Sequence, residues 1–296
     1  MPTDEIRISV RDLVKKFGSQ TVLTGVNLDI AAGETIVIMG GSGCGKTTLL
    51  RLLIGSHQPT SGTISLLGQD IASLDGDGFD ALKKQFGILF QSGALFQSMS
   101  VGDNVALPLQ ENTDLAPETI EMIVKMKLEL VGLRQHANKR PSQISGVMMK
   151  RAGLARAMAM DPKILFYDEP SAGLDPVTSA EIDQLILELT RNFGVTSVVV
   201  THEMDSAFTI ADRMVMLDGG RVLMIDKREE FDRIRKLPES EAKNLTEDQQ
   251  IVYQFLRGAA DGPITRRRSA DDYREDLLGI DAQGNDVVGG SHSARR

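Results

Sequence analysis

The chain has 296 residues, a hydrophobic fraction of 41% and a formal net charge of −8. This length and composition accommodate one large α/β domain or two smaller ones, each with a packed core. The acidic balance argues against a nucleic-acid partner, because nucleic-acid-binding domains usually present a basic face, and the one cysteine, Cys44, excludes an internal disulfide framework.

Three strands are expected near the start of the chain. Residues 6–10 and 26–30 alternate apolar and polar side chains, and this period of two is typical of half-solvated antiparallel strands. Residues 35–39 form a short apolar run instead, which indicates a strand that is buried on both faces.

A phosphate-binding loop pattern, G-x-x-x-x-G-K-[ST], follows this strand at residues 40–47, and a helical segment, residues 48–54, comes next. Phosphates are favoured there by the loop backbone N–H groups and by the positive end of the helix. Lys46 can reach the β- and γ-phosphates, and the Thr47 hydroxyl can ligate Mg²⁺. A chance match is the alternative, which the flanking strand and helix disfavour, so we expect a nucleoside triphosphate to bind. The residues predicted to hold it are Gly40, Gly41, Ser42, Gly43, Cys44, Gly45, Lys46, Thr47 and Thr48.

A mostly helical stretch in the middle of the chain carries two apolar stripes. The first consists of Ile120, Ile123, Val124, Leu128 and Val131, and the second of Met122, Met126 and Leu130. Both recur at helical spacing, and we expect both to pack into the core. The alternative for the second stripe is an adaptable binding surface, a common use of methionine-rich faces.

A buried strand that ends in two acidic residues comes next. Residues 164–167 form an apolar run directly before Asp168 and Glu169, and residues 195–200 form a second run after an amphipathic segment, residues 181–189. This alternation predicts a parallel sheet with helices on its faces. Asp168 can hold Mg²⁺ through water, and Glu169 can orient or deprotonate an attacking water.

The order and spacing of the motifs resemble those of the ATP-binding cassette (ABC) ATPases. Ser145-Gly146 precede the two acids, residues 171–176 (Ser-Ala-Gly-Leu-Asp-Pro) follow them, and Val200-Thr201-His202-Glu203 come later. The resemblance implies an α/β fold with a P-loop (RecA-like) parallel core sheet, an antiparallel β subdomain and a helical subdomain. It also implies ATP and Mg²⁺ as cofactors and ATP hydrolysis as the activity.

The same resemblance gives roles to single residues. Phe17 corresponds to the aromatic that stacks on adenine, Gln91 to the Q-loop glutamine, and His202 to the switch histidine near the γ-phosphate. Taken alone, Phe17 also fits a core position, and a lone histidine is more often structural. The signature motif contributes Ser145 and Gly146, and the D-loop contributes Asp175. The expected catalytic residues are thus Glu169, His202 and Gln91, and the expected metal ligands are Thr47, Gln91 and Asp168.

One position departs from the family pattern. The family usually reads L-S-G-G, whereas this chain has Ile144-Ser145-Gly146-Val147. In the family, ATP lies between the phosphate loop of one subunit and the signature motif of another, so one cassette per chain implies a homodimer. A side chain at Val147 is expected to crowd that approach or to demand an unfavourable backbone angle. We therefore expect retained ATP binding with reduced turnover.

A narrower resemblance is to the ATPases of phospholipid transporters of the Mla/MCE type. It rests on residues 87–101, 104–109 and 254–264, and overall it covers about residues 6–264. It implies a permease dimer in the inner membrane, a periplasmic lipid-binding MCE protein and a small STAS-domain regulator as partners. Residues 92–101, next to Gln91, are where coupling helices of a permease are expected to dock.

We therefore expect the ATP-binding subunit of an ABC transporter, which hydrolyses Mg-ATP in a dimer to drive phospholipid transport through a separate permease. The first residues lack the features of a secretion signal, and no apolar run approaches the ~18 residues of a membrane span. Any membrane role is therefore expected to be peripheral, and the resemblance implies a place on the cytoplasmic face of the inner membrane. Two alternatives remain: an importer ATPase for small polar solutes, and an ATP-dependent switch or assembly protein that scarcely hydrolyses ATP.

The expected organisation has three parts. Residues 1–235 form the ABC ATPase domain, with the helical subdomain at about residues 92–155 inserted in its core. Residues 236–265 form a C-terminal extension with a short helix, and residues 266–296 form a disordered tail, because charged and small residues dominate there.

Overall fold

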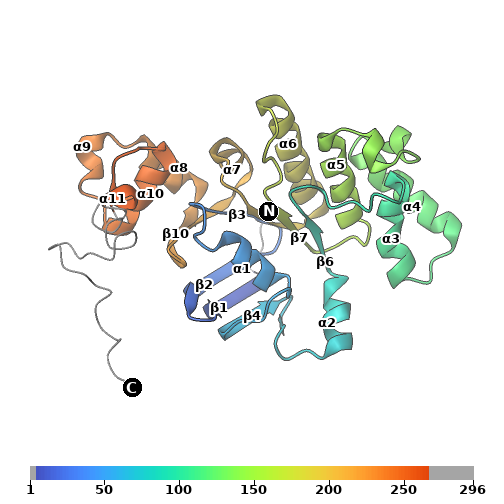
Figure 1. Ribbon diagram of the computed structural model, residues 1–296, viewed down its shortest axis with the longest axis horizontal. Coiled ribbons are helices and arrows are strands. Elements are labelled where there is room, and N and C mark those ends of the chain that lie inside the picture. The colour runs from blue at the N-terminus through green and yellow to red at the C-terminus, as the bar shows by residue number, and fades with distance from the viewer. Residues whose placement is uncertain (1–4, 267–296) are drawn as a thin grey trace, which may run out of the picture. The chain divides into compact units, whose positions relative to one another are not determined.

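The structure, a computed structural model, describes residues 5–266. The tail expected at residues 266–296 therefore lies, except for its first residue, outside the described residues. The chain divides into two compact units, Met1–Asp232 and Arg233–Arg296 (Figure 1). Across residues 5–266, no helix has both the length and the apolar character needed to cross a membrane.

A six-stranded sheet forms the centre of the first unit, with the strand order β10-β9-β3-β8-β7-β6. All neighbours are parallel except the edge strand β10, which pairs antiparallel with β9. Every residue of β3 is buried, as expected for a strand covered on both faces. The strands are β3 (Thr35–Gly40), β6 (Phe86–Leu89), β7 (Ile164–Asp168), β8 (Thr196–Val200), β9 (Arg213–Asp218) and β10 (Arg221–Lys227).

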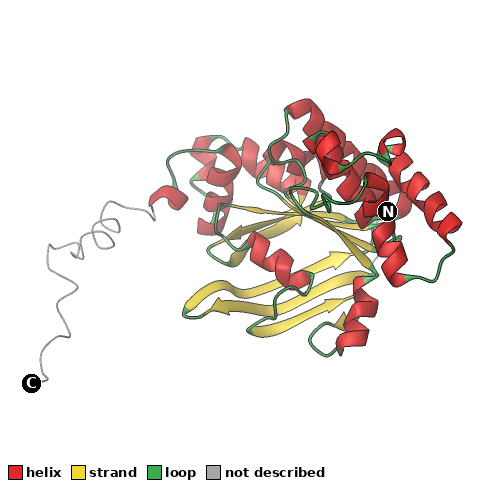
Figure 2. Ribbon diagram, turned by 45° about the vertical axis from the view of Figure 1, so that its right-hand side comes forward, coloured by secondary structure: helices red, strands yellow, loops and turns green. Residues whose placement is uncertain are grey.

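A second, antiparallel sheet has the strand order β2-β1-β4-β5. Its strands are β1 (Ile6–Phe17), β2 (Gln20–Ala31), β4 (Ser61–Leu66) and β5 (Gln69–Asp70). The alternation at residues 6–10 and 26–30 correctly predicted antiparallel strands there, and these two strands pair with each other. Helix α1 (Lys46–Leu53) lies between the two sheets (Figure 2), and one apolar cluster joins residues of both sheets and of this helix.

Helices pack around the parallel sheet, and three of them, at residues 101–112, 117–130 and 146–157, pack on one another at one side of it and form the helical group (Figure 1). Besides α1, the helices around the sheet are α2 (Gly76–Lys83), α3 (Val101–Asn112), α4 (Pro117–Leu130), α5 (Gly146–Ala157), α6 (Pro176–Phe193) and α7 (Met204–Ile210), with short 3-10 turns η1 (Arg134–His136) and η2 (Pro141–Gln143). The amphipathic pattern at residues 181–189 correctly predicted a helix, since α6 contains this segment.

The prediction for the second apolar stripe of α4 was wrong. The first stripe is largely buried, but Met122 is 63% exposed, Met126 61% and Leu130 39%. Helix α4 packs on α3 and α5, and neighbours on one side cannot cover two stripes of the same helix. The second stripe therefore faces solvent.

The second unit is helical. Helix α8 (Arg228–Lys236) contains the boundary between the units, and α9 (Glu239–Ala242), α10 (Glu247–Arg257) and α11 (Pro263–Arg266) follow. Thr246 caps the start of α10 by accepting a hydrogen bond from the Gln249 N–H. The buried Gln254 side chain accepts from the Ile264 N–H at 2.7 Å and donates to the Ala259 carbonyl at 3.1 Å, which ties α10 to the start of α11.

Candidate functional site

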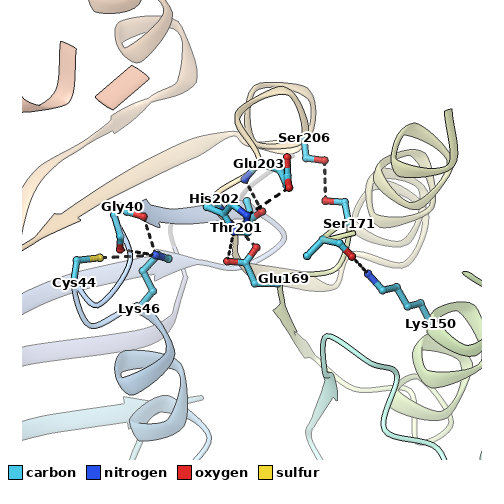
Figure 3. A network of polar contacts seen from close by, with 12 residues as sticks. Gly40, Cys44, Lys46, Lys150, Glu169, Ser171, Thr201, His202, Glu203 and Ser206 are labelled. Atoms are coloured by element: carbon cyan, nitrogen blue, oxygen red, sulfur yellow. Dashed lines mark hydrogen bonds and ion pairs between the residues drawn. The ribbon is translucent and has the colours of Figure 1, made fainter. Parts of the chain in front are cut away.

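Three neighbouring parallel strands place the candidate residues at one edge of the six-stranded sheet. Strands β3, β8 and β7 are adjacent and parallel, so their carboxyl ends lie side by side. Gly40 ends β3, Asp168 ends β7, and Thr201-His202 follow β8. The phosphate loop, Glu169 and His202 thus meet at this edge (Figure 3), and Asp168 directly precedes Glu169 at the end of β7.

Two positions of the phosphate loop require glycine, because of their backbone conformation and their close neighbours. Gly40 has φ +152°, and a Cβ there would lie 2.2 Å from the Leu217 carbonyl oxygen. Gly45 caps helix α1 with φ +109°, and a Cβ there would lie 2.7 Å from Leu23 of β2. Close packing against β9 and β2 therefore fixes the loop in a shape that side chains would disturb. The other loop residues, which keep partial or full solvent exposure, are Gly41, Ser42, Gly43, Thr47 and Thr48.

The Lys46 side chain folds back over the loop. Its Nζ donates to the carbonyl oxygens of Gly40 at 2.8 Å and Gly41 at 2.9 Å, and lies 3.9 Å from the Cys44 Sγ. Cys44 is buried, and burial raises the pKa of its thiol, so little reactive thiolate forms at neutral pH. A phosphate group entering the loop offers Lys46 charged acceptors in place of neutral carbonyls.

Glu169 and His202 form a hydrogen-bonded pair. The His202 Nδ1 lies 2.8 Å from one Glu169 carboxylate oxygen, and the His202 backbone N–H donates to the other at 3.3 Å. Glu203 lies on the other side of the imidazole, 3.5 Å from its Nε2. The Glu169 side chain is 15% exposed and that of His202 57%. This arrangement leaves an oriented carboxylate beside an accessible imidazole, which suits the activation of a water molecule.

Oxygen donors at the same edge fit Mg²⁺. Asp168 ends β7, Thr47 is exposed at the start of α1, and Gln91 is exposed just after β6. Burial, and then the charge of Glu169, raise the pKa of Asp168, while Arg51 lowers it, so a nearby cation would stabilise the carboxylate. No group of three or more His, Cys, Asp or Glu side chains in residues 5–266 could hold a metal by itself. Such a sparse set suits Mg²⁺, which usually keeps waters and phosphate oxygens among its ligands.

The predicted signature and D-loop residues cap helices. Ser145 precedes α5 and accepts from the Met148 N–H at 3.3 Å, and Gly146 begins that helix. Asp175 precedes α6 and accepts from the N–H groups of Val177 at 3.1 Å and Thr178 at 3.2 Å. These hydrogen bonds are local, so each residue orients the start of its own helix.

Val147 lies inside helix α5. Its backbone is therefore right-handed helical, which any L-residue adopts, and the expected unfavourable backbone angle was wrong. The Val147 side chain is partly exposed. That it crowds the approach of the signature motif to the ATP of the other subunit stays a prediction.

Phe17 ends β1 and is 45% exposed. The His57 ring meets it edge-on, with centroids 5.5 Å apart, and the Lys15 Nζ lies 4.8 Å from its centroid. The exposed ring offers a surface on which a base could stack.

Sequence reasoning missed a buried polar network behind Glu169. Lys150 on α5 donates to two carbonyl oxygens of the loop after Glu169. On the other side of that loop, Ser171 contacts Ser206 at 3.0 Å, and Ser206 donates to Asp183. The only sequence signal was a lysine within a largely apolar segment, residues 147–155, and an acidic residue beside the apolar face of α6. Neither distinguishes a buried polar side chain from an exposed one.

The stability of the Asp183→Asn variant, relative to that of the unmodified chain, is expected to increase as the pH rises. Burial raises the pKa of Asp183 in the folded state, and the Ser206 hydrogen bonds offset this in part. From about pH 4 upward the unfolded chain loses this proton before the folded one, so the aspartate contributes progressively less stability. Asparagine does not titrate. The Tm of the variant minus that of the unmodified chain should therefore rise with pH in thermal melts.

Asp175→Asn is the matched control, and its sign is opposite. Hydrogen bonds from Thr178 lower the pKa of the exposed Asp175 carboxyl, so its contribution to stability is present at neutral pH and is lost as the pH falls through the folded pKa. The Tm difference for this variant should fall as the pH rises. The same sign for both variants would contradict this account.

Comparisons with known proteins show which chains this one is similar to. Residues 23–172 match the family described as "ABC transporter". The chain is 40% identical to the intermembrane phospholipid transport system ATP-binding protein MlaF of Haemophilus influenzae, over 92% of this chain and 98% of MlaF. It is 42% identical to the probable ribonucleotide transport ATP-binding protein mkl of Mycobacterium leprae, over 90% of this chain and 73% of mkl. Among solved structures, the ATP-binding cassette MJ0796, a dimer in a post-hydrolysis state with ADP and Pi, matches with a TM-score of 0.69 and 31% identity, over 75% of this chain and 98% of that one.

Proposed function

The chain belongs to the ABC transporter family of ATP-binding proteins, and we propose that it is the ATP-hydrolysing subunit of a phospholipid transporter. The observation that carries the proposal is the 40% identity to MlaF, which extends over 98% of that protein. An alignment of this extent includes residues 87–109 and 254–264, the segments on which the resemblance to phospholipid-transport ATPases rests.

We assign the chemistry to the residues at the sheet edge. Lys46 and the loop N–H groups bind the ATP phosphates, and Phe17 stacks on adenine. Mg²⁺, held by Thr47, Asp168 and Gln91 with waters, neutralises phosphate charge when bound. Within this frame, Glu169 orients and deprotonates the attacking water, and His202 holds the Glu169 carboxylate and can donate to the γ-phosphate.

Two further proposals concern the assembly. A second copy of the chain supplies Ser145 and Gly146 to each ATP, a view supported by the dimeric form of the MJ0796 cassette. A permease docks near Gln91, where a cavity of about 500 Å³ lies between the sheet and the helical group. Its lining includes Ile88, Phe90, Pro108, Asn112, Arg156 and Met160. A groove lined by both apolar and polar side chains suits a short amphipathic helix.

These partners would place the chain on the cytoplasmic face of the inner membrane. We further propose an MCE lipid-binding protein and a STAS-domain regulator in the same assembly, because the MlaF resemblance implies both. The 42% identity to mkl favours one alternative, an ATPase for ribonucleotide transport. Ribonucleotides are small polar solutes, so this is a form of the importer alternative.

Affinity purification of the tagged full chain from detergent-solubilised membranes tests the proposal. We expect a polytopic permease, an MCE protein and bound phospholipid in the purified complex, identified by mass spectrometry. A tagged Lys46→Met variant without added ATP controls for contacts that do not depend on nucleotide. A permease with a solute receptor, or bound ribonucleotide, would contradict phospholipid transport, and soluble partners alone would favour the switch or assembly reading.

Val147→Gly is expected to raise the ATPase rate. Removal of the side chain should relieve crowding where helix α5 approaches the ATP of the partner copy. If this lowers the free energy of the transition state by about 1 kcal/mol, kcat rises about fivefold. Val147→Ala should give an intermediate rate. Phosphate release from the full chain measures both, and equal rates for all three proteins would show that Val147 does not limit turnover.

A further inference from the structure

Lys150 is a buried cation on the helix that follows the predicted signature motif. The residue is 6% exposed. Its Nζ donates to the carbonyl oxygens of Pro170 and Ala172, each at 2.8 Å, and Figure 3 shows it directed at the loop that follows Glu169. Burying a charged group is costly unless it is hydrogen-bonded. These two bonds therefore tie the position of the loop to that of helix α5.

The loop that Lys150 holds begins at a strained residue. Glu169 has φ +50°, in the left-handed region that residues other than glycine adopt rarely. Such a conformation persists where the surrounding structure over-determines it. The Glu169 N–H donates to the Val200 carbonyl at 2.8 Å, and the Lys150 bonds fix the residues that come directly after.

A second tether holds the same loop from the opposite side. The Ser171 side chain is buried and contacts Ser206 at 3.0 Å, and Ser206 donates to both carboxylate oxygens of Asp183 at 2.9 and 2.7 Å. Ser206 lies on α7, one turn after His202, while Asp183 lies on α6. The loop is thus held to α7 and, through Ser206, to α6 on one side, and to α5 on the other. Of these tethers, the one made by Lys150 comes from α5, the helix that follows the predicted signature motif.

We propose that Lys150 is a positioning residue, which holds residues 169–172 so that the Glu169 carboxylate stays against His202. The inference rests on the proposed role of Glu169 in ATP hydrolysis. Lys150 acts through the backbone of the loop rather than on the reacting atoms. Burial lowers the pKa of Lys150, and the negative charge of Glu169 opposes this shift and favours the ammonium form.

Lys150→Met tests the proposal in the full chain, because methionine fills the space of the side-chain stem but cannot donate. We expect kcat for Mg-ATP hydrolysis to fall about 10- to 100-fold, the scale on which small misplacements of catalytic groups act. The Kd for Mg-ATP should change by less than about twofold, since the phosphate loop is held separately. Amide hydrogen exchange in residues 171–175 should become faster.

Lys150→Arg should restore most of the rate, because a guanidinium also donates to carbonyl oxygens. The matched control is Lys127→Met, which removes a lysine that is also 6% exposed and pairs with Asp161 on another part of the helical group. We expect it to lower Tm without changing kcat per folded molecule or the exchange in residues 171–175.

Unchanged kcat and exchange in folded Lys150→Met would overturn the proposal, as would an equal loss of kcat in Lys127→Met. Failure of the proposed function gives a different result. If the unmodified chain does not hydrolyse ATP, alone or with its permease, the ATPase role fails, whereas amide exchange in residues 171–175 still decides whether Lys150 holds the loop.

Discussion

Glu169→Gln is expected to lower the rate of ATP hydrolysis about 10³-fold, within the range that general-base catalysis contributes. Glutamine keeps the size of the side chain and can still contact His202, but its amide cannot take a proton from water. ATP should bind as before, because the phosphate loop and Lys46 contact each other rather than Glu169. Phosphate release under single-turnover conditions measures the first effect, and the Kd for Mg-ATP the second.

Glu203→Gln is the matched control for Glu169→Gln. Glu203 is the other carboxylate beside the His202 ring, at 3.5 Å from Nε2, but it lies on the opposite side from Glu169. The control variant should keep the rate within about threefold, as expected for a partly exposed charge pair. If Glu169→Gln keeps more than about a tenth of the rate, or if the two variants lose activity equally, Glu169 is not the general base.

The sheet edge could be predicted from the sequence because the motifs that make it are short and contiguous. The phosphate loop and the acidic pair each follow an apolar run, and Thr201-His202 follows a third. Once three such runs are parallel neighbours, their carboxyl ends must meet. The position of each motif directly after an apolar run is therefore enough to predict that these residues meet at the sheet edge.

The environment of Lys150 could not be predicted in the same way. Its acceptors are backbone carbonyls about twenty residues away, and every residue carries a carbonyl, so no sequence pattern marks them. Asp183 is hidden for a related reason, since its partner Ser206 lies on another helix. The exposed Met122 and Met126 show the opposite limit: helical spacing identifies an apolar face but not whether another element covers it.

Gly40→Ala is expected to destabilise the first unit and to abolish ATP binding. The added Cβ would lie 2.2 Å from the Leu217 carbonyl oxygen and 2.7 Å from the Cys44 Sγ, at a φ of +152° that side chains rarely adopt. Strain and overlap with backbone together should cost about 3 kcal/mol or more, which corresponds to a fall in Tm of about 6–12 °C for a domain of this size.

The loss of ATP affinity follows from the same displacement. To relieve the overlap, the loop must move away from β9, and its N–H groups then no longer converge on the phosphates. We expect the Kd for Mg-ATP to rise at least about 100-fold, equivalent to about 2.8 kcal/mol, in isothermal titration at a temperature where the variant is folded.

Gly41→Ala separates local strain from a general intolerance of side chains in this loop. A Cβ at Gly41 meets no atom within 4 Å, so we expect its Tm to stay within about 2 °C of that of the unmodified chain. Only its stability is compared, because Gly41 is itself a proposed phosphate-binding residue. Equal melting temperatures for the two alanine variants would show that contact with Leu217 does not shape the loop, and the requirement for glycine at position 40 would then lie with the bound phosphates alone.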